Sequence, residues 1–160
     1  MDRLDIPSTQ ASPQDLATIQ TTNAKLVQQG LDKLGANLLL NKVSRVAQAV
    51  SSTTYVKLTE WQAQVVTSGG LIAIWWESYL KYDGAGNLNI QLLIDDLPVK
   101  TVAGLGLTGN SVVQSPLTWV GQLNAGSHTI KFQALVNAGT QTVGNASSDS
   151  TLYVVELLKG

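Results

Sequence analysis

The residues best able to do chemistry in this chain are a single histidine and a few carboxylates. His128 is the only histidine, which excludes a His–His metal site and leaves one candidate for a general base. Its position in the alternation of the following strand puts it on the same face as Ile130 and Phe132. Packing at the edge of a core, with a hydrogen bond to the ring, explains such a residue without catalysis. We therefore expect no catalytic histidine.

The oxygen-bearing residues are also better explained by turns than by chemistry. Asp95 and Asp96 are adjacent in a predicted turn, where acidic side chains bond to local backbone N–H groups. On a strand they would point to opposite sides, which argues against an acid/base pair working on one bond. Asp83 and Asn87 flank glycines but lack the ligand spacing of a calcium loop. The sequence predicts a protein that is not an enzyme, with no cofactor and no metal site.

The composition points to a surface that is covered by other protein. Only 13% of the 160 residues are charged, against about 25% in ordinary soluble domains. Charge is depleted in this way at the buried centres of protein–protein interfaces. We expect the chain to assemble with copies of itself or within a larger assembly; the alternative is a monomer with a polar, uncharged surface.

The charge and apolar patterns argue against a nucleic-acid partner and against a membrane-spanning segment. The basic residues are dispersed and the net charge is −1, which predicts no nucleic-acid partner. The longest apolar run, Leu71–Trp76, is too short to span a membrane. The first residues lack a signal-peptide pattern, so synthesis in a cytoplasm is expected.

The N-terminal third predicts an arm and a helical stem. Residues 1–11 lack periodicity and are expected to be extended. Ser12 can cap a helix and Pro13 fits its first position, so residues 12–54 are expected to form an α-helical stem. Its first half carries a stripe with spacings of three or four residues, formed by Leu16, Ile19, Asn23, Val27, Leu31, Leu34 and Leu38.

This stripe is narrow, so such a helix needs a partner, and three arrangements are open. Three copies of the helix can pair as a short coiled coil, with Asn23 setting the register. The helix can instead lie on another protein of an assembly. In the third arrangement it folds back on the β domain of its own chain.

Residues 55–160 switch to a period of two, which is typical of strands. Predicted turns at Ser68–Gly70, Asp95–Asp96 and Asn124–Gly126 divide the segment. About eight strands without intervening helices predict an antiparallel jelly-roll β-sandwich. The whole chain is thus expected to be mainly β, with the helical stem preceding the sandwich.

Two predicted strands, Leu71–Tyr82 and Thr151–Leu158, are apolar on both faces. An antiparallel sheet ordinarily shows water on one side, so the second face of each strand must meet something else. We expect it to meet neighbouring copies. The candidate trimer interface consists of Leu71, Ala73, Trp75, Tyr79, Tyr153, Val155 and Leu157.

The hairpin Leu123–Phe132 and the closing strand Ser150–Leu157 resemble a known group. Together with the hairpin around Leu93–Asp96, they are similar to the trimeric TNF/C1q-like jelly-roll knobs of bacteriophage virion proteins, which occur at fibre tips and on capsids. The resemblance covers about Tyr55–Lys159. It implies a homotrimeric structural protein of the virion, made in the host cytoplasm and attached to capsid or tail subunits through residues 1–54.

Within that class two roles remain open. The chain can be a capsid decoration or head-fibre protein, which the absence of a long shaft favours. It can instead be a tail-fibre or receptor-binding tip that recognises a host surface glycan or protein. A third reading, from another class, is a soluble carbohydrate-binding C1q-like module.

Overall fold

The chain folds into an antiparallel β-sandwich, as the twofold alternation predicts. The structure is a computed structural model that describes residues 21–27, 29–30, 35–83, 86–106 and 112–159; within these, residues 21–27 and 29–30 are helical. The strands are β1 (Asn37–Ser44), β2 (Gln48–Val50), β3 (Val56–Asp83), β4 (Asn87–Ile94), β5 (Leu97–Gly106), β6 (Val112–Val136), β7 (Thr140–Val143) and β8 (Ser150–Lys159).

The framework of the sandwich is one long ribbon made of β3 and β6. These strands pair antiparallel almost end to end, from Val56 opposite Ala134 to Lys81 opposite Val112. The other strands each join one half of the ribbon: β8 pairs with Gly70–Glu77 of β3, and β4 pairs with Ile130–Val136 of β6.

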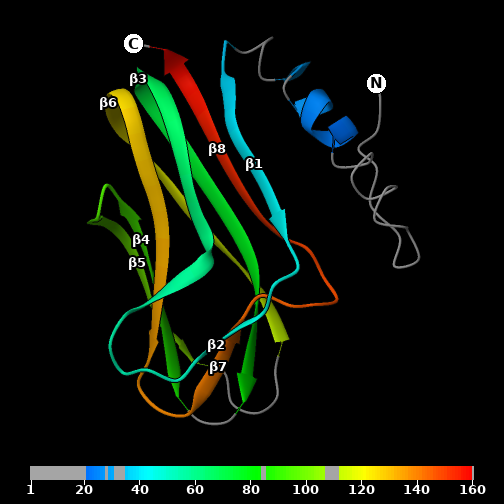
Figure 1. Cartoon of the computed structure of the whole chain (residues 1–160), viewed down its shortest axis with the longest axis vertical. Helices are drawn as coiled ribbons and strands as arrows, with labels where there is room; N and C mark the ends of the chain where they lie inside the picture. The colour runs from blue at the N-terminus through cyan, green and yellow to red at the C-terminus, as the bar shows by residue number, and fades with distance from the viewer. Residues whose placement is uncertain (1–20, 28, 31–34, 84–85, 107–111, 160) are drawn as a thin grey trace.

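The ribbon therefore contributes to both layers, as Figure 1 shows. One layer has the order β1-β8-β3-β6, and the other contains β5-β4-β6-β3. At the far end of β3, β7 pairs with it and β2 pairs with β7. A long antiparallel ribbon wrapped into two packed layers is consistent with a jelly roll.

The predicted turns at Ser68–Gly70 and Asn124–Gly126 are wrong, because both segments are bends inside continuous strands. Ser68 pairs with Ala125 and Gly70 with Leu123 across the bend. Gly69, Gly70 and Gly126 have φ angles of +89°, +141° and +142°. Such angles suit glycine and let a strand turn sharply without ending. The glycines thus redirect the ribbon from one layer to the other.

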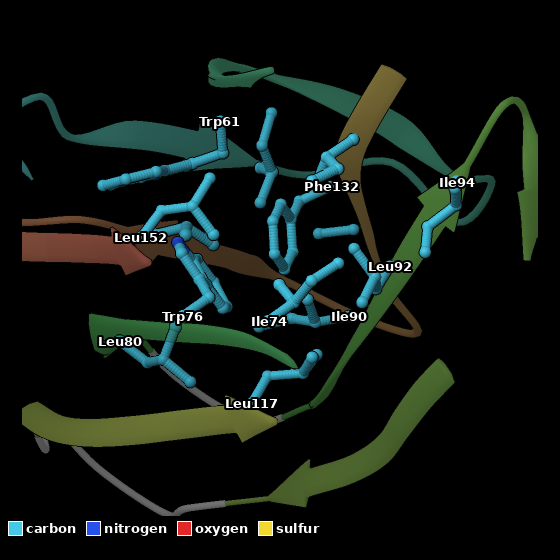
Figure 2. Packing of buried hydrophobic residues seen from close by; sticks show 14 of the residues in the cluster. Trp61, Ile74, Trp76, Leu80, Ile90, Leu92, Ile94, Leu117, Phe132 and Leu152 are labelled. Atoms are coloured by element: carbon cyan, nitrogen blue, oxygen red, sulfur yellow. The ribbon is translucent and has the colours of Figure 1, made fainter. Parts of the chain in front are cut away.

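The core lies between the layers and is built around three aromatic rings. Trp76 stands 5.9 Å from Trp61 in an edge-to-face contact and 4.7 Å from Phe132, measured between ring centroids. Figure 2 shows these rings surrounded by aliphatic side chains from both layers. The inward parity of the predicted strands is confirmed, since the alternate residues Ile72, Ile74, Leu152 and Val154 are all buried. This core fixes which faces of β3 and β8 point outward.

The prediction of a helix over residues 12–54 is wrong for its second half. Residues 37–44 and 48–50 are the strands β1 and β2. β1 pairs with β8 from Asn37 opposite Glu156 to Ser44 opposite Ser150. A short apolar run such as Leu38–Leu40 fits both helical and strand patterns, so periodicity alone cannot separate them. Pairing with β8 decides it here, and it places Leu38 in a strand.

Of the other residues in the predicted stem stripe, the structure describes Asn23 and Val27. Asn23 and Val27 lie in the helical segment, and Val27 lines a groove with residues of β3 and β8. Figure 1 shows this segment outside the sandwich. Leu16, Ile19, Leu31 and Leu34 fall outside the described residues, as does the arm of residues 1–11. In the part of the chain that is described, no helix has the length and apolar character needed to cross a membrane.

Candidate association face

The outward side of β3 and β8 carries the residues predicted for self-association. Ala73 is paired with Val155, and Trp75 with Tyr153, so these four side chains lie on one face of the layer. Leu71 and Tyr79 have the same parity along β3, and Leu157 lies next to them at the irregular end of β8. The structure thus brings the seven predicted residues to one side of one layer.

Two further residues extend this face. Val120 of β6 is opposite Ala73, and Leu38 of β1 is opposite Val155. Neither was predicted for the interface, although the alternation of Trp119 and Val120 on the two sides of a strand carried the signal. We define the association face as Leu38, Leu71, Ala73, Trp75, Tyr79, Val120, Tyr153, Val155 and Leu157.

The association face is exposed at its centre. Trp75 is 55% exposed and Val120 is 57% exposed, although both are large apolar side chains. They occupy neighbouring strands, so their exposed surfaces are parts of one patch rather than scattered positions. A patch of this kind on a small domain marks an interaction surface.

Part of the face is bounded by the helix of the same chain. A groove of about 510 Å³ is lined by Val27 of the helical segment and by Ala73, Trp75, Tyr153, Val155 and Leu157. Val27 therefore approaches the β8 side of the face, whereas Trp75 keeps half of its surface open. The helix covers part of the association face and leaves Trp75 at its centre exposed to solvent.

Charge is scarce on this side of the molecule. Along β3, Glu77 and Lys81 are the charged residues that follow Trp75 with the same outward parity. Burial raises the pKa of the Tyr153 hydroxyl, and the neighbouring Glu77 carboxylate raises it further. The tyrosine therefore stays neutral at physiological pH. A neutral phenol adds a hydrogen-bonding group to an apolar face without adding a charge.

The outward side of the other layer has the opposite character. The Gln133 amide donates to Gln91 Oε1 at 2.6 Å, and the Gln91 amide donates to Thr101 Oγ1 at 3.0 Å. Lys131 donates to Asp96 at 2.6 Å beside this ladder. Polar groups that bond to one another across strands suit a water-facing surface. The sandwich thus has one apolar and one polar outer face.

The residues considered for catalysis lie where the β4–β5 turn meets β6, at the end of the polar face that carries the Lys131–Asp96 pair. His128 Nδ1 is 2.7 Å from Asp95 Oδ2, and His128 Nε2 is 2.9 Å from the carbonyl oxygen of Asn124. A general base needs a free nitrogen lone pair directed at its substrate. Both ring nitrogens are engaged, which agrees with the predicted hydrogen bond to a ring at the edge of the core.

The two aspartates of the turn have separate partners. Asp95 contacts His128, and Asp96 accepts from Lys131. Asp95 and Asp96 have φ angles of +52° and +68°, which are typical of a two-residue hairpin turn. Across the described ranges, acidic and histidine side chains do not gather in threes as a metal site requires.

The comparisons with known proteins bear on the fold alone. No family model and no curated protein matches the chain. Rabbit GITRL is similar over 68% of this chain and 80% of its own, with 20% identity and a TM-score of 0.42. Eiger TNF from S. frugiperda is similar over 78% and 96%, with 10% identity and a TM-score of 0.46.

A virus structure is similar over a comparable part of this chain. The structure of infectious bursal disease virus, Gx strain, aligns with 77% of this chain and 37% of its own, with 14% identity and a TM-score of 0.49. These likenesses concern the arrangement of strands in a sandwich. They leave the function of this chain to be argued from its own surface.

Proposed function

We propose that this chain is a non-enzymatic structural protein that assembles with copies of itself through the association face. The observation that carries the proposal is the exposed apolar centre of that face, formed by Trp75 and Val120 on adjacent strands. Covering it with a copy of the same chain removes apolar surface from water, which is the main favourable contribution to association. The polar opposite face remains free for solvent.

The number of copies and the setting are proposed from the sequence resemblance. The hairpin Leu123–Phe132 and the strand Ser150–Leu157 resemble trimeric knobs of phage virions, so we propose a homotrimer on a virion surface, as a capsid decoration or head-fibre protein. The sequence predicts that residues 1–54 attach the knob to the virion. Because β1 and β2 belong to the sandwich, we propose that the residues before β1 make this attachment.

The first test is the mass of the purified full chain in solution by light scattering. A trimer gives about 51 kDa, three times the chain mass of 17.0 kDa. Trp75→Lys places a charge at the centre of the face and is expected to give monomers. Leu97→Lys is the matched control, because Leu97 is also an exposed apolar residue, at 69%, but lies on the β4–β5 hairpin. A wild-type chain that stays monomeric, or a Trp75→Lys trimer, would contradict the proposal.

The two virion roles differ in copy number. Decoration of a capsid requires a copy at every equivalent surface site, whereas tail fibres are few. Quantitative mass spectrometry of purified particles, with the major coat protein as the internal reference, therefore separates them. A ratio close to that of the coat protein supports decoration, and a ratio lower by orders of magnitude supports a tail-fibre tip.

The carbohydrate-binding alternative has one specific observation in its favour. Trp75 exposes its ring beside Tyr153, and flat aromatic faces stack on sugar rings. This alternative predicts that a monomeric wild-type chain binds glycans on an array and that Trp75→Ala abolishes the binding. The full chain must be used, since removing the first fifty residues would delete β1 and β2.

A further inference from the structure

A histidine with two hydrogen-bond partners lies where the β4–β5 turn meets the bend of β6. The His128 side chain is only 12% exposed there. Its Nδ1 lies 2.7 Å from the Asp95 carboxylate, and its Nε2 lies 2.9 Å from the carbonyl oxygen of Asn124. Asn124 belongs to the bend, and Asp95 belongs to the turn between β4 and β5.

Both partners of the ring accept hydrogen bonds and donate none. A carboxylate and a backbone carbonyl each need an N–H directed at them, and neutral imidazole has a single N–H. Only the imidazolium form satisfies both contacts. In the neutral form one ring nitrogen presents a lone pair to an oxygen, and that contact is lost.

The contacts of the His128 ring with Asp95 and Asn124 connect segments from different strands. Asp95 accepts the backbone N–H of Thr129 at 2.8 Å through its second oxygen, and its own N–H donates to the Thr129 carbonyl at 2.9 Å. The Asn124 carbonyl also accepts the hydroxyl of Thr67 at 2.7 Å. The ring therefore links the β4–β5 turn, the bend of β6 and, through Asn124, the bend of β3.

We propose that His128 is a pH-sensitive clasp that fastens the β4–β5 turn to the bend of the β3–β6 ribbon when it is protonated and releases one of them when it is neutral. The carboxylate of Asp95 holds the proton on Nδ1, so Nε2 is the nitrogen that gives up its proton. Loss of that proton sets the lone pair of Nε2 against a lone pair of the Asn124 carbonyl oxygen. The bend of β6 is then the part that is released.

The charges around the ring are consistent with this device. Asp95 is the acidic residue that contacts the His128 ring. The next residue, Asp96, is paired with Lys131 of β6. On β3, Val65 is opposite His128, and Val65 and its neighbours Gln64 and Val66 are uncharged. The contact with Asn124 and then that with Asp95 raise the pKa of His128. The N–H of Thr129 and then His128 lower the pKa of Asp95.

These directions define the pH window in which the clasp is closed. A histidine with a raised pKa stabilises the fold fully below its ordinary value of 6.5 and loses that contribution as pH rises through the raised value. An aspartate with a lowered pKa stabilises the fold above its ordinary 3.8 and loses the contribution as pH falls through the lowered value. The clasp is therefore strongest between these two ordinary values.

The experiment uses the single histidine of the chain as its own reporter. The ring resonances of His128 are followed by NMR against pH in the full-length protein, together with the exchange of the Ala125 and Gly126 amides, which lie in the bend of β6. We expect titration above pH 6.5. We also expect exchange of the two amides, corrected for its intrinsic pH dependence, to be about tenfold faster in the neutral form, because one charge-assisted hydrogen bond is lost.

Two variants separate the clasp from ordinary packing. Asp95→Asn is expected to lower the titration midpoint of His128, and His128→Gln to remove the pH dependence of amide exchange. Lys131→Gln is the matched control, because it breaks the neighbouring pair with Asp96 and leaves the ring contacts in place. Titration of the wild type at or below pH 6.5, or amide exchange that does not change with ring protonation, would overturn the proposal. The wild-type titration decides it even where a variant fails to fold, and it does not depend on self-association.

Discussion

Two adjacent tryptophans show how strand parity assigns different tasks to the same residue type. Trp76 is fully buried against Trp61 and Phe132, whereas Trp75 is 55% exposed on the association face. Successive side chains of a strand point to opposite sides, so the two indoles are separated by the thickness of the layer. One belongs to the core and the other to the surface that we propose as an interface.

We predict that truncation of these residues has unequal effects on the stability of the isolated chain. Trp76→Ala removes a buried ring from the centre of the core and should lower the free energy of unfolding by about 3–5 kcal/mol. Trp75→Ala should change it by less than about 1 kcal/mol. Urea unfolding, at protein concentrations low enough to populate monomers, measures both. Equal losses would show that Trp75 contributes to the core of its own chain.

At the scale of elements, alternation predicted most of the sandwich and failed where local pattern is ambiguous. The inward residues of β8 and of the Ile72–Leu80 part of β3 follow a period of two, and the Asp95–Asp96 turn is where the sequence predicts it. The bends at Gly69 and Gly126 read as turns, because glycine permits both a chain reversal and a bend. Pairing with a distant strand distinguishes them, and no local pattern reports it.

Strand pairing that no local pattern reports also explains two further differences. One is the predicted helix where β1 lies, and the other is the absence of Leu38 and Val120 from the predicted interface. Leu38–Leu40 fits a helix by spacing, and only β8, more than a hundred residues later, makes it a strand. The interface residues of β3 and β8 were predicted because each strand is apolar on both sides. Leu38 and Val120 were missed because their place on the face depends on which strands become neighbours.

The bend of β3 is held by a carboxylate from another strand, and this leads to a prediction. Glu156 of β8 is 1% exposed, and its Oε1 accepts both the backbone N–H of Ser68 at 2.9 Å and the Ser68 hydroxyl at 3.0 Å. Glu156→Leu leaves the backbone N–H without its acceptor and should lower the free energy of unfolding by about 1–3 kcal/mol.

Ser68→Ala is the matched control for that change. It removes the hydroxyl and keeps the bond between the backbone N–H and Glu156, so its effect should be clearly smaller. Thermal or urea unfolding of both variants provides the comparison. A serine variant as damaging as the leucine variant would mean that the hydroxyl, rather than the backbone contact, holds the bend.

At the scale of the whole molecule, the sandwich has two outer faces of opposite character. The association face is apolar, with Glu77 as the acid at its edge. The other face carries the Gln133–Gln91–Thr101 ladder and the Lys131–Asp96 pair. This asymmetry provides for contact on one side and hydration on the other. Under the proposed association only one face has to attract water, which agrees with the low charged fraction of 13%.

Association through an apolar face should respond weakly to salt. Screening weakens contacts between exposed charges, and the burial of apolar surface is unaffected or strengthened by salts such as sulfate. We predict that raising sodium chloride from about 0.05 to 0.5 M leaves the dissociation constant of the assembly unchanged within about a factor of three, and that sulfate tightens it. Sedimentation velocity at both salt concentrations measures this. A steep weakening in sodium chloride would indicate a charged interface instead.

The position of β8 affects how the protein can be made. β8 lies between β1 and β3, so the first strand of the sandwich has its pairing partner in the last one. A growing chain that has not yet passed Ser150 leaves β1 without its pairing strand and leaves the Gly70–Glu77 edge of β3 open beside Ile74 and Trp76. Open strand edges beside apolar side chains pair readily with other chains. Folding of this sandwich therefore requires β8, and a chain that ends before Ser150 would expose unpaired strands instead of forming a smaller folded domain.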